Sequence, residues 1–234
     1  MSDRYSILIV ADHASNFIPE EYNNLGLPNR LIESHIAYDL GIKKLSLELS
    51  KKLNAHLIIG SHSRLLVDLN RGVNDPTLIS CISHGSKIIQ NYNLSSRDKR
   101  FRMNKIYDNY HNKISKIIKK NKINLIISLH SFNPYYKKKK RNIKFGILSN
   151  DDRRYSNILL EILSKKGYRV GDNQPYEGNL IEDTMYRHGL QNRILHTLIE
   201  IRNDLLQNSK SIAEVTNILF QAIKSSKQKV AKYL

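Results

Sequence analysis

Three segments that lie far apart in the sequence each carry a polar side chain at or beside an apolar run. The run 7–10 leads into Asp12 and His13, the run 125–129 leads into His130, and Glu200 lies within the apolar stretch LIEIR. Two imidazoles with one or two carboxylate or amide oxygens can bind a zinc ion and leave one position open for water. The metal lowers the pKa of that water, and a nearby carboxylate can accept its proton. These residue types therefore predict a metal site that activates water.

Each of these residues also has a simpler explanation. The chain contains nine histidines, so a histidine after a strand can arise by chance. Seven of them have no comparable context, namely His35, His56, His62, His84, His111, His188 and His196. Carboxylates are almost never fully buried unless they are paired or used, and Arg202 lies two residues after Glu200. An ion pair of Glu200 with Arg202 or a lysine at the sheet end is thus the alternative to a catalytic role.

A second candidate group lies in the segment SRLLVDLNR, residues 63–71. Arg64 and Arg71 flank a short apolar run, and Asn70 precedes Arg71. Guanidinium groups bind carboxylates through paired hydrogen bonds, and a neighbouring amide can add another, so this group could bind an anionic substrate. Asp68 could instead pair with one of the arginines and orient it. The alternative is a pair of surface arginines that flank an edge strand.

The charge of the chain raises nucleic acid as a partner. Lys and Arg number 38 against 21 Asp and Glu, which gives a formal charge of +17. The cations are spread over the whole chain, and the one dense run, residues 137–141, follows Tyr135 and Tyr136 in an expected loop. This distribution favours a solvated basic surface that attracts small anions, and a nucleic-acid partner is not expected. The competing hypothesis is a non-enzymatic nucleic-acid-binding protein that uses this loop and the basic helix 97–120.

The single cysteine, Cys81, excludes a disulfide framework and any zinc site with several thiolates. A metal would therefore be bound by His, Asp, Glu or Asn. The apolar run near the start is too short for a secretion signal or a membrane span. We therefore expect a cytoplasmic protein without a membrane anchor.

Short apolar runs alternate with longer segments of helical period, which predicts an α/β fold with a central mixed, largely parallel sheet and helices on both faces. The length suits one domain over residues 1–234. The expected strands are residues 6–10, 56–60, 65–69, 125–129, 144–148 and 195–201, and the expected helices are 39–53, 96–121, 153–165 and 211–227, with long loops at 15–27 and 72–92. Ligands of such sheets bind beyond the carboxyl ends of the strands, so the three polar groups are expected to meet there.

Six motifs then carry a resemblance to a known family. They are DHASNFIPEEYNNLGLP, SRLLVDLNR, LHSFNP, GDNQPYEG, RHG and LIEIRNDL, which occur in this order over residues 6–206. The chain resembles the N-formylglutamate amidohydrolases, which are similar to the zinc carboxypeptidases and the N-acyl amino acid deacylases. This resemblance implies a carboxypeptidase-like mixed sheet of about eight strands that is wrapped by helices.

The resemblance also implies roles for individual residues. His13 and His130 would bind one divalent metal, zinc, and Glu200 would be the general base. Arg64 would polarise the scissile carbonyl or bind a carboxylate, and Asn70 with Arg71 would hold the α-carboxylate of the substrate.

One position departs from the pattern of these relatives, and two more are only weakly assigned. Asn16 occupies the place of a metal-binding glutamate, and an amide oxygen is a poorer zinc ligand than a carboxylate. Asn16, Asp12 or Asp39 is therefore the third ligand, or the metal site is degenerate. Tyr176 and His188 are candidates for substrate contact, with ordinary packing as the alternative.

The function that the resemblance implies is metal-dependent hydrolysis of N-formyl-L-glutamate, or a similar small anionic N-acyl amino acid, to the free amino acid and formate or another carboxylic acid. A deacylase or peptidase of the same superfamily with another acyl or peptide substrate is the first alternative. A fold that has lost catalysis is a further one. The sequence does not predict the oligomeric state.

Overall fold

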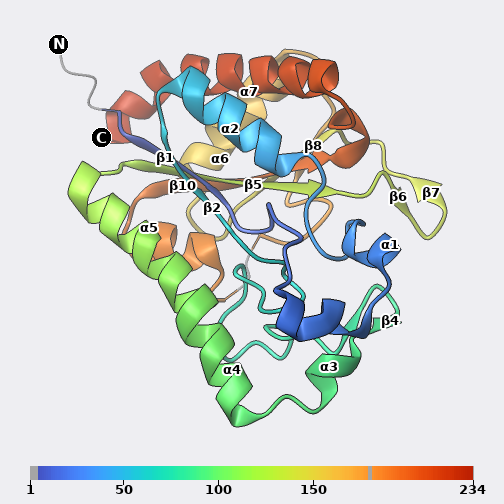
Figure 1. The fold of residues 1–234 in the computed structure, drawn as a ribbon. Helices are drawn as coiled ribbons and strands as arrows, with labels where there is room; N and C mark the ends of the chain where they lie inside the picture. The colour runs from blue at the N-terminus through green and yellow to red at the C-terminus, as the bar shows by residue number, and fades with distance from the viewer. Residues whose placement is uncertain (1–4, 179–180, 234) are drawn as a thin grey trace.

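The centre of the structure is a six-stranded sheet whose strands follow the order β2-β1-β5-β10-β8-β9 (Figure 1). The structure is a computed structural model, and it describes residues 5–178 and 181–233. The strands are β1 (Ile7–Ala11), β2 (His56–Ile59), β5 (Leu125–Phe132), β8 (Phe145–Leu148), β9 (Val170–Asp172) and β10 (Leu195–Arg202). Strands β2, β1, β5 and β10 are mutually parallel, whereas β8 pairs antiparallel with β10 and parallel with β9. The mixed, mostly parallel α/β sheet predicted from the sequence is thus confirmed, with six strands rather than about eight.

The two central strands are buried along their whole length. Every residue of β5 (LIISLHSF) and of β10 (LHTLIEIR) is buried. Strands that are covered on both faces need apolar side chains on both, which explains why their apolar residues are nearly continuous instead of alternating. The few polar residues in them are Ser128, His130 and Ser131 in β5 and His196, Thr197, Glu200 and Arg202 in β10.

Helices cover both faces of the sheet, as predicted. Helices α2 (Ile42–Leu53), α6 (Arg154–Lys165) and α7 (Ser209–Val230) pack on one face, above the sheet in Figure 1. Helix α5 (Asp108–Asn121), below the sheet in Figure 1, packs on the other face together with the helical turn η1 (Glu20–Gly26). The side chains of β1 alternate between these two cores, with Ile7 and Ile9 in the first and Leu8 and Val10 in the second.

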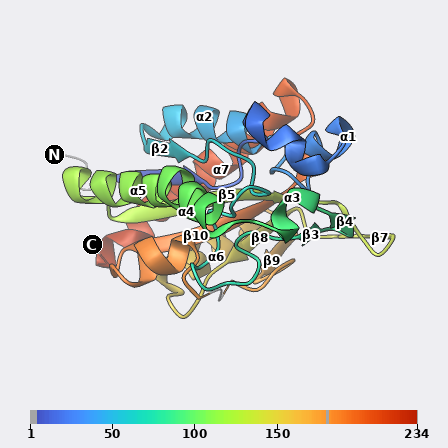
Figure 2. The same cartoon turned by 60° about the horizontal axis from the view of Figure 1, so that its bottom comes forward.

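Shorter elements surround the ends of the strands, and Figure 2 shows them from another direction. They are α1 (Asn29–Ile32), α3 (Ile89–Tyr92), α4 (Ser96–Arg102), η2 (Met103–Tyr107), η3 (Tyr186–Leu190), η4 (Asn203–Leu205) and η5 (Ala231–Tyr233), with the hairpins β3 (Ile82–Ser83) to β4 (Ser86–Lys87) and β6 (Tyr135–Tyr136) to β7 (Lys139–Lys140). The helix expected over 96–121 consists of α4, a π-helical turn η2 and α5 in direct succession.

One expected strand is wrong, and five short observed strands were not expected: β9 in the main sheet and β3, β4, β6 and β7 in the two hairpins. Residues 65–69 form no strand; they are a buried turn whose leucines and Val67 fill the second core. Its backbone groups bond outside the sheet, since the Leu66 carbonyl accepts from Arg102 (3.0 Å) and the Asp68 amide donates to the Leu78 carbonyl (2.8 Å). An apolar run can thus be buried without joining a sheet once other groups satisfy its backbone. Strand β9 has only three residues, too few to show a pattern.

Over residues 5–178 and 181–233, no helix combines the length and the apolar character that crossing a membrane requires.

Candidate active site

The carboxyl ends of β1, β5 and β10 meet because these strands are neighbours in the sheet. The pairing register sets Val10 of β1 beside Ser128 of β5 and sets His130 of β5 beside Glu200 of β10. Since alternate residues of a strand share a face, His130 and Glu200 project from the same side as Ser128. His13 follows β1 by two residues. The side chains of His13, His130 and Glu200 line a cavity of about 350 Å³ at this edge of the sheet.

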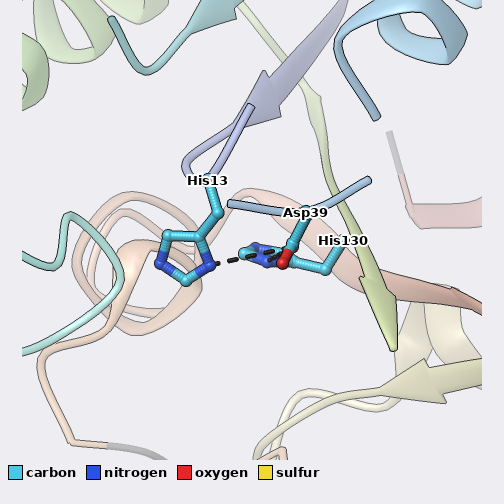
Figure 3. A group of neighbouring side chains, drawn as sticks. All are labelled: His13, Asp39 and His130. Carbon is cyan, nitrogen blue, oxygen red and sulfur yellow. Dashed lines mark hydrogen bonds and ion pairs between the residues drawn. The ribbon is translucent and has the colours of Figure 1, made fainter. Parts of the chain in front are cut away.

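Two histidines and one aspartate form a compact group in the cavity (Figure 3). Suitable ligand atoms of His13, Asp39 and His130 all lie within 4.8 Å of one another, and all three residues are buried. The Oδ2 atom of Asp39 is 2.9 Å from Nδ1 of His130 and 3.7 Å from Nδ1 of His13. Two imidazoles and a carboxylate are a donor set that suits zinc with one position left for water or substrate. The residues present therefore fit a divalent metal.

Asp39 lies at this position because of the turn that precedes α2. Its backbone amide donates to the carbonyl of His13 (2.8 Å), and its Oδ2 accepts from the amide of Ser131 (3.2 Å). Gly41 then lets the chain turn into α2 with a φ of 78°, and a Cβ at this glycine would collide with Leu206. The carboxylate is thus tied to the ends of both β1 and β5.

The second nitrogen of each imidazole bonds to another carboxylate. Nε2 of His13 lies 2.6 Å from Oδ1 of Asp68, and Nε2 of His130 lies 3.0 Å from Oδ2 of Asp12. Asp12 in turn accepts hydrogen bonds from Tyr110 (2.9 Å), Ser128 (2.9 Å) and Thr184 (2.7 Å). Histidines that bind a metal commonly donate their other ring N–H to a carboxylate in this way, which fixes the tautomer and the ring orientation.

The same contacts perturb the pKa values of the group. Burial lowers the pKa of an imidazole, but the hydrogen bonds and charges of Asp12 and Asp39 outweigh it and raise the pKa of His130 well above its usual value. Burial raises the pKa of the Asp39 carboxyl, yet the Arg64 guanidinium and the two histidines hold it well below its usual range. The site therefore retains an ionised carboxylate at its centre.

Arg64 lies against this group and is held by backbone carbonyls. Its terminal nitrogens lie 3.0 Å from Oδ1 of Asp39 and 3.3 Å from Nδ1 of His13, and it also donates to the carbonyls of His35 and Ile36. These contacts fix the guanidinium at the cavity wall.

Asn70 and Arg71 also line the cavity and are oriented by their neighbours. Oδ1 of Asn70 accepts from the amide of Thr184 (3.1 Å), so its NH₂ group is left to donate elsewhere. Arg71 donates to the Asn70 carbonyl (2.9 Å) and to Oγ1 of Thr77 (3.1 Å).

Glu200 is buried, and it forms no ion pair within residues 5–178 and 181–233. Its side chain lines the cavity, and Oε2 has no hydrogen-bond partner among the residues that the structure describes. Burial raises the pKa of the Glu200 carboxyl to about 7. The alternative of an ion pair with Arg202 is wrong, because Arg202 donates to Asp204 (2.8 Å) and to the Arg141 carbonyl (2.7 Å).

Three of the expected residues do not lie where a role in the cavity would require. Asn16 is not among the described residues of the cavity wall, and its Nδ2 donates to the Ile32 carbonyl (3.3 Å). Asp12 bonds to the far nitrogen of His130, so Asp39 is the alternative that lies between the two histidines.

His188 is buried away from the cavity wall, and its Nε2 lies 2.9 Å from Nδ1 of His111. His188 therefore has a packing role, which was the alternative to substrate contact. Tyr176 does line the cavity and is 42% exposed.

Several cavity residues were not identified from the sequence. His35, His84 and Asp183 line the wall, although none follows an apolar strand. Burial raises the pKa of Asp183 to about 7, and its Oδ1 accepts from the Tyr186 amide (2.7 Å). Asp68 was considered only as a partner of an arginine, whereas its hydrogen bond to His13 is the closer contact. No sequence pattern marks these loop residues, because the fold alone brings them to the strand ends.

The chain was compared with known proteins. The profile of the N-formylglutamate amidohydrolase family matches residues 5–207. Among solved structures, the gene product Atu2144 from Agrobacterium tumefaciens is 29% identical with a TM-score of 0.92, and the alignment covers 97% of this chain and 92% of that one. An N-formylglutamate amidohydrolase from Ralstonia eutropha JMP134 shares the fold at 17% identity with a TM-score of 0.76, covering 99% of this chain and 97% of that one. Curated protein sequences gave no match.

The family profile spans the whole six-stranded sheet and every described residue of the cavity wall. The resemblance that the six motifs carried is thereby confirmed. The chain belongs to the N-formylglutamate amidohydrolase family and is a hydrolase that acts on an amide bond.

Proposed function

We propose that this protein hydrolyses N-formyl-L-glutamate, or a similar N-acyl amino acid, with one divalent metal, zinc, bound by His13, Asp39 and His130. One observation carries the proposal. A group that fits a metal lies beside a buried carboxylate whose Oε2 has no hydrogen-bond partner among the described residues, and the two are fixed in register on adjacent strands through His130 and Glu200.

The metal, when bound, would polarise the scissile carbonyl and lower the pKa of a water molecule. The protein contributes the orientation of the two imidazoles. With the metal bound, Asp68 and Asp12 would accept from the outer nitrogens of His13 and His130, so that the inner Nδ1 atoms would be available as ligands.

Glu200 acts as the general base of the reaction. It takes a proton from the attacking water, whose oxygen joins the acyl carbon, and it passes a proton to the amine nitrogen as the C–N bond breaks. A pKa of about 7 suits both steps, since a carboxyl of this kind both accepts and releases a proton near neutral pH.

Arg64, Asn70 and Arg71 bind the carboxylates of the substrate. All three line the cavity; Arg64 and Arg71 supply cationic donors, and Asn70 supplies an NH₂ group that can donate. A dicarboxylate would be preferred to a neutral amide, because its second carboxylate would accept charge-assisted hydrogen bonds from Arg64 or Arg71 that a neutral amide forms less well.

The proposal is tested by the release of glutamate from N-formyl-L-glutamate, with N-acetyl and N-succinyl glutamate as comparison substrates. We expect turnover by the zinc-loaded protein, loss of turnover after chelation, and recovery on adding zinc back. His188→Phe is the matched control, because it replaces a buried histidine outside the cavity. No hydrolysis of any of the three substrates by zinc-loaded protein would contradict the proposal.

A further inference from the structure

The hairpin formed by β6 and β7 carries the densest run of cations in the sequence. It follows β5 after two residues and extends beyond the body of the molecule (Figures 1 and 2). Residues 137–141 are four lysines and Arg141, and all four lysines are exposed. Tyr135 and Tyr136 are also exposed, at 56% and 58%. The hairpin thus presents cations and two aromatic rings to solvent.

Neither ion pairing nor turn chemistry explains the hairpin lysines. Within residues 5–178 and 181–233, no carboxylate forms an ion pair with them; Lys137 instead lies over the ring of Tyr136 at 5.5 Å. Lys137 and Lys138 occupy the turn with φ of 45° and 66°, a conformation that Asn and Gly adopt more readily. Lysine at both positions therefore has a less favourable backbone energy than Asn or Gly would have, and hairpin formation alone does not require lysine there.

Arg141 connects the hairpin to the active-site cavity. Its guanidinium lies among three rings, 5.3 Å from Tyr136 in the hairpin, 5.4 Å from Phe132 in β5 and 5.4 Å from Tyr176 at the cavity wall. Arg141 also donates to the Asn133 carbonyl (2.9 Å), which holds it at the base of the hairpin. Phe132 lies two residues beyond His130 on the same strand. The basic surface and the cavity are therefore continuous through Arg141 and Tyr176.

We propose that this hairpin is a second substrate-binding surface, which takes the acidic acyl part of substrates longer than an N-formyl amino acid. This inference rests on the proposed function, which determines which side of the scissile amide faces the hairpin. Asn70 and Arg71, in the loop 63–71, would hold the amino-acid side of the scissile amide, which leaves the acyl side to extend past Tyr176 to the lysines.

The substrate class that fits this surface is a short acidic peptide whose last residue enters the cavity. One water is consumed for each amino acid released: its oxygen joins the acyl carbon, the C–N bond breaks and the amine takes the proton. An acidic peptide fits better than a nucleic acid because the cations continue into a cavity whose own candidate ligands are carboxylate binders.

The test measures peptide binding separately from catalysis. Fluorescein-labelled tetraglutamate is titrated, by fluorescence anisotropy, against zinc-loaded protein that carries Glu200→Gln to prevent turnover. The test variant replaces Lys137, Lys138, Lys139 and Lys140 with Gln. The matched control replaces four exposed lysines of α5, Lys113, Lys116, Lys119 and Lys120, and so removes the same charge.

We expect the hairpin variant to weaken peptide binding by about tenfold at low salt and the control by less than about twofold. A peptide of three glutamines and one glutamate should bind both proteins weakly and equally. Equal losses in the two variants would overturn the proposal, because the effect would then come from net charge alone. Hairpin-dependent binding of oligo(dT) without hairpin-dependent binding of the peptide would also overturn it, in favour of nucleic acid.

Failure of the proposed function can be told apart from failure of this inference. If wild-type protein does not hydrolyse N-formyl-L-glutamate but peptide binding depends on the hairpin, the surface stands and only the proposed reaction fails. If hydrolysis proceeds while peptide binding does not depend on the hairpin lysines, only the inference about the hairpin fails.

Discussion

Two pairs of buried histidines in this protein have opposite surroundings. In the cavity, the rings of His13 and His130 lie 4.8 Å apart, and every ring nitrogen has a carboxylate oxygen within 4.0 Å. On the α5 side of the sheet, the rings of His111 and His188 are stacked 5.2 Å apart, and they hydrogen-bond to each other. The rings of Tyr107 and Tyr110 lie beside His111, and among the residues that the structure describes no carboxylate forms an ion pair with either histidine.

The difference shows what makes a buried histidine a candidate for chemistry. Carboxylates raise the pKa of His130, whereas burial lowers the pKa of His111 to about 3 and that of His188 to about 4. Burial and proximity are common to both pairs. Only the cavity pair combines carboxylates that orient the rings with an opening to a substrate-sized space.

The largest effect is expected from removing a cavity histidine. His13→Ala and His130→Ala should each lower kcat/KM for amide hydrolysis by about 10³-fold or more, because the metal supplies several kcal/mol of transition-state stabilisation. His188→Phe should leave kcat/KM within about twofold, since it is not part of the cavity wall. Kinetics and zinc content measured on the same preparations check both. Equal losses of kcat/KM in the cavity variants and in His188→Phe would show that the two histidine pairs do not differ in their role.

Loss of the candidate base should separate catalysis from metal binding. Glu200→Gln keeps the shape of the side chain but cannot accept the proton, so kcat should fall by about 10²–10⁴-fold. Zinc content and the thermal unfolding midpoint should not decrease, since the neutral amide removes a buried carboxyl that burial already disfavours in its ionised form. Unchanged kcat in a zinc-loaded Glu200→Gln protein would exclude Glu200 as the base.

The carboxylates behind the histidines should have a smaller effect. Asp68→Asn and Asp12→Asn remove the charge that orients His13 and His130 but leave the metal-facing atoms in place. We expect zinc affinity to fall by about 10–100-fold in each, as measured by competition with a chromophoric chelator. Asp204→Asn is a suitable control because this carboxylate pairs with Arg202. A zinc affinity that does not change would mean that the outer carboxylates do not support the site.

The other histidine pair should affect stability and not activity. His188→Phe leaves Nδ1 of His111 without its partner, so the free energy of unfolding should fall by about 1–3 kcal/mol at pH 7. In the wild type, the unfolded chain takes up a proton on these imidazoles below about pH 6.5, but folded His188 does so only near pH 4. The contribution of His188 to stability is therefore complete above about pH 6.5 and is lost as the pH falls toward 4.

Urea unfolding at several pH values between 4.5 and 7 checks this prediction. The curve of unfolding free energy against pH should be less steep in His188→Phe than in the wild type. Equal slopes would show that His188 is not held neutral in the folded protein.

The strands that form the site could be predicted from the sequence, because their side chains must be apolar on both faces. The runs of β1, β5 and β10 were identified, and the polar residues His13, His130 and Glu200 stood out against them. The prediction that their carboxyl ends meet follows from parallel pairing, and the structure bears it out. The family and the fold class were likewise identified from the motifs and the periodicity.

The residues between the strands could not be placed in this way. Asp39 was one of three alternatives for the third ligand, because its position depends on the turn at Gly41 and on hydrogen bonds to His13 and Ser131. The apolar run 65–69 has a strand-like composition but is buried as a turn, since side chains and loops satisfy its backbone. Asp183 and His84 come to the cavity from loops whose paths only the folded chain defines.

The most direct test of the account is the position of a bound metal. Crystals of the zinc-loaded protein, measured at the zinc absorption edge, should show one strong anomalous peak per chain, bounded by Nδ1 of His13, Nδ1 of His130 and the carboxylate of Asp39. A peak beside His111 and His188, or no peak at the cavity despite stoichiometric zinc in solution, would show that His13, Asp39 and His130 do not form the metal site.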